Sequence, residues 1–426
     1  PIPAPKGSFQ RVCGHTTRLH MSRMLLPGPR LRLVLLAVLA AALSPAGAIP
    51  LPRLGRTIEA SGGTADTTGK AATTGSTAAR SPLPASPRAR GDAPAASGVH
   101  LSAGLGSKGF RTFTDEEGRE RVFHGVNAVV KGPPWLPTSG AFNLNTSLGA
   151  DDFSFLQDLG VNVIRLGVMW AGVEPVRGQY NTTYLKQAKA LAAEAAQYGI
   201  YTLIDMHQDV MSEKFCGEGV PGWAAQPSGT LGFPLPRAMA YTQVDPITKF
   251  PSGKDCNKLG WPNYYLTEAA STAFQNLYDN KDGLLDAWGA MWAQVALTFK
   301  GDKHIIGLEL INEPWAGDVV HNPSLLLPGE AARQNLQPAY DSLAKAIRAV
   351  DPTVLIFFEG VTWAQPGFKA VPGGAAFGEY SVLAYHHYEI PAGPRLGNTS
   401  TTDVKARISD AGHLGAGLFL SEFAEP

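Results

Sequence analysis

Two acidic residues each close a short apolar run in this chain. Glu313 follows the run 305–311 and precedes Pro314, which stops strand pairing, and Glu422 follows the run 417–421. Such runs are typical of buried strands in a parallel sheet. For one acid alone, a loop residue that happens to follow a strand is the simpler interpretation. Two carboxylates at the C-terminal ends of two buried strands, however, are the pair that glycoside hydrolysis uses.

Two basic residues, Arg165 and His207, also lie in or directly after predicted strands. Arg165 interrupts the apolar strand predicted over 161–166. It would form a structural ion pair, and the same pair would keep a nucleophilic carboxylate ionised. His207 follows the strand predicted over 200–206. A histidine there is more often a structural hydrogen-bonding residue than a catalyst.

Three polar residues accompany the acids. Asn312 directly precedes Glu313, and its amide could hold a sugar 2-hydroxyl group. His386 and Tyr388 are two positions apart, so both should point to one side of an extended segment, where the tyrosine hydroxyl could orient Glu422. The chain has no His-Glu-x-x-His motif and no paired Cys-x-x-Cys motif, so we predict no metal and no cofactor.

Strand and helix patterns alternate through the rest of the chain. Strands are predicted over 122–126, 161–166, 200–206, 305–311, 354–358, 381–385 and 417–421, and helices over 153–159, 184–198, 284–299, 336–350 and 403–411. A hairpin around the turn 115–118 precedes the first strand, and 208–282 is a long excursion. Strands separated by helices indicate a parallel sheet. We therefore predict an α/β fold, a (β/α)₈ TIM barrel that stops before its eighth strand.

The seventh strand is the last one that the sequence offers. We expect the open edges at 122–126 and 417–421 to make residues 49–426 aggregate or to leave them inactive. In the alternative, the segment 110–113 closes the gap and the barrel is complete. Short hairpin strands more often cover a barrel floor than enter its wall, which favours the first expectation.

The first hundred residues have a different composition. We predict four regions: an upstream segment of unclear status at 1–20, a signal peptide at 21–48, a disordered low-complexity linker at 49–100, and the catalytic domain at 101–426. The signal has arginines before the apolar run 33–43 and small residues before Ile49. Retention of that run as a membrane anchor is the alternative. A secreted or lumenal protein is expected.

Several motifs occur in one order: His124-Gly125-Val126-Asn127, Arg165, His207, Leu310-Ile311-Asn312-Glu313-Pro314, His386-x-Tyr388 and Ser421-Glu422-Phe423. This ordered set resembles glycoside hydrolase family five, from about Phe110 to the end of the chain. Within that family, the segments 127–131, 207–210 and 217–223 resemble the endoglycoceramidases (endoglycosylceramidases), which cut the bond between a whole glycan and ceramide.

The resemblance implies roles for individual residues. It makes Glu313 the acid/base and Glu422 the nucleophile of a retaining mechanism. It places Lys131, Asp209 and Trp223 among the residues that hold the glucose next to ceramide. Two features depart from the family pattern. The sequence shows neither the eighth strand, whose end carries a tryptophan, nor the β-sandwich that follows it, and the insertion 226–262 has no assigned role.

Two other functions remain open. One is a different family-five β-glycosidase, such as a glucosylceramidase, a steryl glucosidase or a cellulase. The other is a non-catalytic carbohydrate- or lipid-binding remnant, against which the presence of both acids argues. The expected partner is a glycolipid substrate, with peripheral contact to a membrane surface. Lysine plus arginine equals aspartate plus glutamate, at 36 each, so nothing indicates a nucleic-acid partner. A monomer is expected.

A disulfide and glycans are expected in this compartment. Cleavage after Ala48 would leave Cys216 and Cys256, which we predict to be bonded, with two free thiols as the alternative. The sequons at 145, 181 and 398 predict N-glycosylation. Apolar residues in the excursion could either meet lipid at the rim of the site or form a satellite core; they are Val220, Pro221, Trp223, Phe233, Leu235 and Trp261.

Overall fold

The computed structural model describes residues 98–139, 143, 145–229, 250–258, 261–361, 367–388 and 399–424. The predicted upstream segment, signal peptide and almost all of the predicted linker lie outside these residues. So do Phe233, Leu235 and Asn398, and the side chain of Trp261. In the described part of the chain, no helix combines the length and apolar character needed to cross a bilayer.

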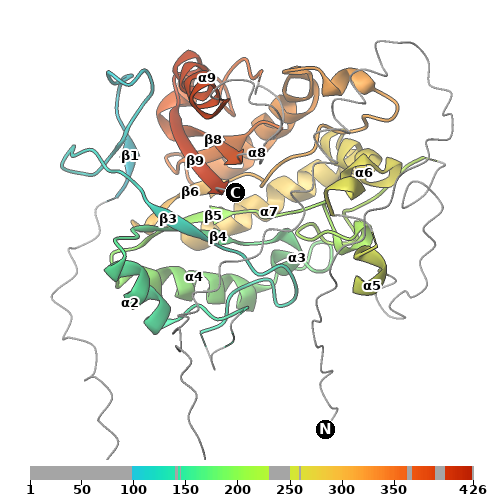
Figure 1. Ribbon diagram of the computed structural model, residues 1–426, viewed down its shortest axis with the longest axis horizontal. Helices are drawn as coiled ribbons and strands as arrows, with labels where there is room; N and C mark the ends of the chain where they lie inside the picture. The colour runs from blue at the N-terminus through green and yellow to red at the C-terminus, as the bar shows by residue number, and fades with distance from the viewer. Residues whose placement is uncertain are drawn as a thin grey trace, which may run out of the picture. The chain divides into compact units, whose positions relative to one another are not determined.

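Seven parallel strands form one sheet, in which each strand neighbours the next in chain order (Figure 1). They are β3 (Gly125–Ala128), β4 (Val163–Gly167), β5 (Tyr201–Asp205), β6 (Ile305–Glu309), β7 (Ile356–Glu359), β8 (Ser381–Tyr388) and β9 (Gly417–Ala424). The strands curl into a nearly closed barrel with helices between them, so the predicted TIM-barrel class is confirmed.

The register of the sheet aligns ionisable residues in neighbouring strands. Asp205 in β5 is paired with Glu309 in β6, and His386 in β8 is paired with Glu422 in β9. A shift between Tyr385 and His386 brings the second pair into line. Parallel strands all end at the same rim, so these polar groups gather at the C-terminal face of the barrel.

The helices are α2 (Ala150–Asp158), α3 (Trp170–Val173), α4 (Thr182–Ala196), α5 (Gly253–Cys256), α6 (Glu268–Tyr278), α7 (Leu284–Phe299), α8 (Gln337–Val350) and α9 (Thr399–Leu414). The side chain of Asn181 caps α4 by accepting a hydrogen bond from the backbone N–H of Tyr184 at 3.0 Å. Helix α6 lies inside the excursion 208–282 and was not predicted. Its apolar residues recur at helical spacing, at 269, 270, 273, 274, 277 and 278, so the pattern that indicates this helix was present in the sequence.

The first barrel strand is β3, not the predicted segment 122–126. Val122 is 74% exposed. The side chain of Asn162 donates to the Val122 carbonyl at 2.8 Å and accepts from the His124 N–H at 2.9 Å. A side-chain amide therefore takes the place of strand pairing here.

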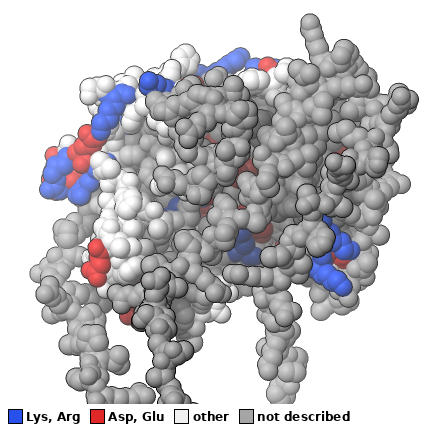
Figure 2. Space-filling model, in the orientation of Figure 1, with Lys and Arg blue, Asp and Glu red and all other residues white. Residues whose placement is uncertain are grey.

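A short hairpin covers the floor of the barrel. Strands β1 (His100–Leu101) and β2 (Phe113–Thr114) pair in antiparallel fashion, and Thr114 bridges Glu120 around the predicted turn. Their apolar side chains join the core, where the Phe113 ring stacks on that of Phe357 at 6.1 Å. Among the described residues visible in Figure 2, lysine and arginine lie next to acidic side chains.

Within the described residues, strands β3 and β9 are the two edges of the sheet and do not pair with each other. A groove of about 540 Å³ lies between them, lined by both edge strands and by the hairpin segment. The segment 110–113 reaches β9 through one bridge, with the Arg111 N–H donating to the Ala416 carbonyl at 3.0 Å. It thus touches the base of β9 and adds no strand to the wall.

Candidate active site

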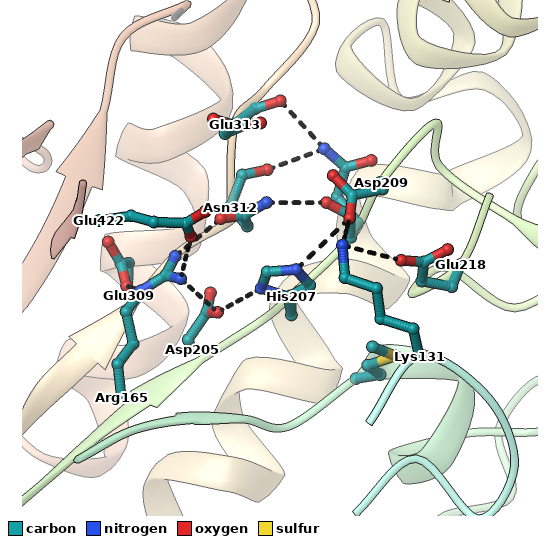
Figure 3. A network of polar contacts seen from close by, with 12 residues as sticks. Lys131, Arg165, Asp205, His207, Asp209, Glu218, Glu309, Asn312, Glu313 and Glu422 are labelled. Carbon is teal, nitrogen blue, oxygen red and sulfur yellow. Dashed lines mark hydrogen bonds and ion pairs between the residues drawn. The ribbon is translucent and has the colours of Figure 1, made fainter. Parts of the chain in front are cut away.

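Arg165 is the centre of the polar network at the C-terminal rim of the barrel (Figure 3). Its side chain is only 3% exposed and faces four carboxylates. Nε lies 2.5 Å from Glu309, Nη1 lies 3.2 Å from Asp205 and 3.3 Å from Glu422, and Nη2 lies 3.6 Å from Glu359. Burial opposes the charged form, but these acids raise the pKa of Arg165, so the guanidinium stays charged.

Three of these acids were not predicted as site residues: Asp205, Glu309 and Glu359. Each is the last residue of its strand, β5, β6 and β7, so an acid that ends a buried strand was the available signal. Their environments differ. Burial raises the pKa of Glu309 to about 8, whereas for Glu359 the effect of burial is outweighed by His386, which lowers its pKa to about 2.

Glu313 has a strained backbone. Its φ of 41° lies in the left-handed region, which a non-glycine residue seldom adopts. The surroundings hold it there: its N–H donates to Glu359 at 3.1 Å and its carbonyl accepts from Gln208 at 3.0 Å. Its carboxylate Oε1 lies 2.8 Å from Nδ1 of His386. The conformation thus presents the carboxylate at the end of β6.

Glu422, on β9, is held by one side chain from β4 and one from β8. Its Oε2 lies 3.3 Å from Nη1 of Arg165, and its Oε1 accepts a hydrogen bond from the Tyr388 hydroxyl. His386 and Tyr388 therefore each hydrogen-bond a different acid, although Nε2 of His386 also lies 4.0 Å from Glu422. The first contacts Glu313 and the second contacts Glu422, from one side of β8 as their spacing indicated.

His207 and Asn312 are held by hydrogen bonds to other polar groups of the site. Nδ1 of His207 is 2.8 Å from Asp205, and Nε2 is 3.6 Å from Asp209. Burial disfavours the charged imidazole, but these carboxylates raise the pKa of His207 to about 9. The Asn312 amide accepts from Arg165 at 2.9 Å and donates to the Gln208 carbonyl at 2.9 Å. Both side chains are thus fixed in orientation.

The residues assigned to sugar binding occupy two places. Lys131 forms an ion pair with Asp209, and its Nζ lies 3.5 Å from Oε1 of Glu218, a residue not predicted for the site. Trp223 packs elsewhere: its indole N–H donates to a backbone carbonyl at 3.0 Å, and a guanidinium lies 5.5 Å from its ring centroid. The partners of this tryptophan are Glu174, Trp170 and Arg177.

The predicted disulfide is present. Cys216 and Cys256 are bonded, with their Cα atoms 5.3 Å apart, and join the short helix η1 (Glu213–Phe215) to α5. Val220 and Pro221 from the same excursion are buried, as a satellite core requires. They are therefore not available to meet lipid.

Glu309, Glu359 and His386 could place one ligand atom each within 4.8 Å of one another. However, Arg165 contacts both of these carboxylates, and Nε2 of His386 lies 3.1 Å from Glu359. A metal cation would have to share this space with a buried guanidinium. The donor set therefore fits the arginine and does not fit a metal.

Comparison with known proteins places this site in a family. Residues 125–425 match the cellulase model, glycosyl hydrolase family 5. An endoglycoceramidase of Cyanea nozakii is 51% identical over 310 residues, covering 72% of this chain and 60% of that protein. For an endoglycoceramidase of Hydra vulgaris the identity is 49% over 310 residues, with 72% and 59% covered. The chain thus spans about 60% of the length of these relatives.

The fold comparison agrees. The crystal structure of an endogalactoceramidase matches with a TM-score of 0.55 and 22% identity, covering 77% of this chain and 68% of that chain. At this identity the match concerns the fold alone. The family model extends from the first barrel strand through the Glu422 strand and so includes every predicted site residue. The chain belongs to glycosyl hydrolase family 5.

Proposed function

We propose that this protein is a retaining endo-β-glycosidase that hydrolyses the bond between oligosaccharide and ceramide in glycosphingolipids. The observation that carries the proposal is the arrangement of two carboxylates around one imidazole. Nδ1 of His386 lies 2.8 Å from Glu313, and Nε2 lies 4.0 Å from Glu422. The relatives with about half of their aligned residues identical are endoglycoceramidases, which favours this substrate class within the family.

Glu422 is the nucleophile in this proposal. Its carboxylate attacks the anomeric carbon of the glucose that is linked to ceramide and forms a glycosyl–enzyme ester. The Arg165 guanidinium, 3.3 Å away, places a positive charge beside this carboxylate and orients it. The Tyr388 hydroxyl, which donates to Glu422, fixes the direction from which the oxygen attacks.

Glu313 is the acid/base. It gives its proton to the departing ceramide oxygen while the glycosidic bond breaks, and afterwards takes a proton from the water that cleaves the ester. Two inversions at one carbon return the original β configuration. The contact with His386 and the strained backbone hold the carboxylate in one position for both steps.

Glucose recognition is assigned to residues in the segments that follow β3 and β5. The Lys131–Asp209 pair offers a donor and an acceptor to vicinal hydroxyl groups. Trp223 would stack on the apolar face of a sugar. Its ring already contacts Arg177 and Trp170, so a sugar would stack on the part of the ring that these two residues leave uncovered.

We also propose a secreted or lumenal location for the mature domain, with N-glycans at the sequons and peripheral contact with a membrane surface. The Cys216–Cys256 bond supports an oxidising compartment. Asn181 is exposed on the surface at the start of α4, where a glycan could be accommodated.

Mass spectrometry of the products from lactosylceramide in detergent tests the function. Intact lactose and ceramide are expected, and the lactose should be released as the β anomer, as followed by proton NMR. The matched control is the double variant Glu313→Gln/Glu422→Gln, which should release neither. Release of glucose from glucosylceramide with no lactose from lactosylceramide would instead identify a glucosylceramidase.

A further inference from the structure

Asp209 and Glu218 face each other across a short antiparallel bridge at the sugar-binding side of the site. The Glu218 N–H donates to the Asp209 carbonyl at 2.8 Å, and the Asp209 N–H donates to the Glu218 carbonyl at 3.2 Å. Their side chains are only 8% and 14% exposed. Two like charges directly opposite each other are destabilising, so this pair requires a shared cation or a shared proton.

Lys131 supplies the cation. It reaches the pair from the segment that follows β3 and is ion-paired with Asp209, with Nζ 3.5 Å from Oε1 of Glu218 (Figure 3). Its side chain is 53% exposed, so the ammonium lies between the buried acids and the open side of the site. The carboxyl groups of Asp209 and Glu218 therefore orient the single ammonium of Lys131 from its buried side.

Two glycines fix Glu218 in this place. A Cβ at Gly217 would lie 1.9 Å from the Asp209 carbonyl oxygen, and one at Gly219 would lie 2.4 Å from the His207 carbonyl oxygen. Only glycine allows the backbone to approach this closely on either side of Glu218. Cys216, directly before them, is tied down by the disulfide. The local sequence is thus built to hold Glu218 opposite Asp209.

We propose that Glu218 is a positioning residue that, together with Asp209, holds the Lys131 ammonium where it binds a substrate hydroxyl group. The inference rests on the proposed function, because it concerns the sugar site of that reaction. Glu218 acts through Lys131 and need not touch substrate itself. In this arrangement the two carboxyl groups have different roles. Asp209 forms the close ion pair with Lys131, and Glu218 limits where the ammonium can move.

The charge state of the trio gives the proposal a distinctive pH dependence. Burial and the Asp209 carboxylate raise the pKa of Glu218 to about 8, against the opposing effect of Lys131 and His207. Below that pH, Glu218 is neutral and accepts through its carbonyl oxygen, which leaves Lys131 paired with Asp209. Above it, a second negative charge draws the ammonium away from Asp209, so KM should rise.

The test is a double-mutant cycle on the full chain, with nitrophenyl β-lactoside and lactosylceramide as substrates. Glu218→Ala should raise KM about tenfold with little change in kcat, and Lys131→Met should raise KM further. The Lys131→Met/Glu218→Ala variant should match Lys131→Met alone. If Glu218→Ala raised KM equally in both backgrounds, Glu218 would act through the fold and the proposal would be overturned.

The conservative variant separates positioning from folding. Glu218→Gln keeps the accepting oxygen, so it should restore the KM lost in Glu218→Ala at pH 6 and remove the rise in KM above pH 8. Glu213→Gln is the matched control, since it removes a half-buried carboxyl from the same loop and should retain the wild-type profile. A rise in KM with its midpoint near pH 8 that persisted in Glu218→Gln would contradict the proposal, whereas titration of His207, whose pKa is about 9, would give a rise with a higher midpoint.

The two substrates keep the inference and the proposed function distinct. Turnover of the soluble lactoside without turnover of lactosylceramide would reject the glycolipid activity, while the effect of Glu218 on KM could still be measured. Normal lactosylceramide turnover with unchanged KM in Glu218→Ala would instead reject the positioning role and leave the activity standing.

Discussion

Nδ1 of His386 lies 2.8 Å from Oε1 of Glu313, and the histidine side chain is almost fully buried. Burial opposes protonation of the imidazole, but Glu359 and Glu313 raise the pKa of His386 well above its ordinary value. At neutral pH the ring is therefore a cation placed against the proposed acid/base. Together with Arg165, it offsets the negative charge of the surrounding carboxylates.

The two acids should respond differently to removal. Glu313→Ala should lose activity on glycolipids, yet azide should partly rescue substrates with good leaving groups and give a β-glycosyl azide, because Glu422 still forms the ester. Glu422→Ala should lose both half-reactions, and azide should attack directly to give the α-azide. NMR of the azide products checks this. The same anomer from both variants would refute the assigned roles.

Tyr388→Phe should lower kcat by roughly 10- to 100-fold, since a hydrogen bond to a charged group contributes about 1.5–3 kcal/mol. The residue is partly exposed at the end of β8, so the free energy of unfolding should change by less than about 0.5 kcal/mol. Steady-state kinetics and urea denaturation measure the two effects. A kcat within twofold of wild type would show that the hydroxyl does not orient Glu422.

Arg165→Met should destabilise the fold as well as abolish activity. It leaves Asp205, Glu309 and Glu359 buried without their guanidinium, and removal of one partner from a buried ion pair costs about 3–5 kcal/mol. Arg165→Lys should recover only part of the loss, because an ammonium cannot match the forked geometry. The midpoint of urea denaturation, together with kcat, checks this order. Equal stability of the methionine variant would contradict it.

Stability should fall as pH rises from about 5 to 9. His207 has a folded-state pKa of about 9 against an ordinary 6.5, so its contribution is complete below pH 6.5 and is lost as pH rises through 9. Glu309, raised to about 8, acts in the same direction because the native state holds its proton longer than the unfolded chain does. Urea denaturation at pH 5, 7 and 9 measures the slope, and His207→Asn should flatten it between 6.5 and 9. Greater stability at pH 9 than at pH 5 would be the opposite result.

Removal of the disulfide by Cys216→Ser should lower the free energy of unfolding by about 2–4 kcal/mol, given a separation of 40 positions between the cysteines. The loop that carries Glu218 should also loosen, so KM should rise more than kcat falls. Cys256→Ser should behave identically. Non-reducing peptide mapping confirms the bond in the wild type, and two free thiols in that protein would remove the basis for the prediction.

The sequence was informative where a breaker residue marked the end of a strand. The apolar run before Asn312-Glu313-Pro314 located β6, which ends at Glu309 and so two residues before the predicted end, and the alternation of elements led to the barrel. The acids Asp205, Glu309 and Glu359 each end a buried strand, but which of them meet at Arg165 depends on the register between strands, which a single sequence does not display. Helix α6 was missed although its apolar residues have helical spacing, because it lies within the long excursion between two barrel strands.

One guanidinium serves four carboxylates at the centre of this site. A substitution at any of the four acids changes the charge that the other three experience, so their mutational effects should be epistatic rather than additive. In other members of the family, substitutions at these four positions are therefore expected to occur together. A neutral residue in place of one acid changes which residues can be accommodated at the other three positions. An evolutionary path that exchanges them singly would pass through intermediates with an uncompensated buried charge.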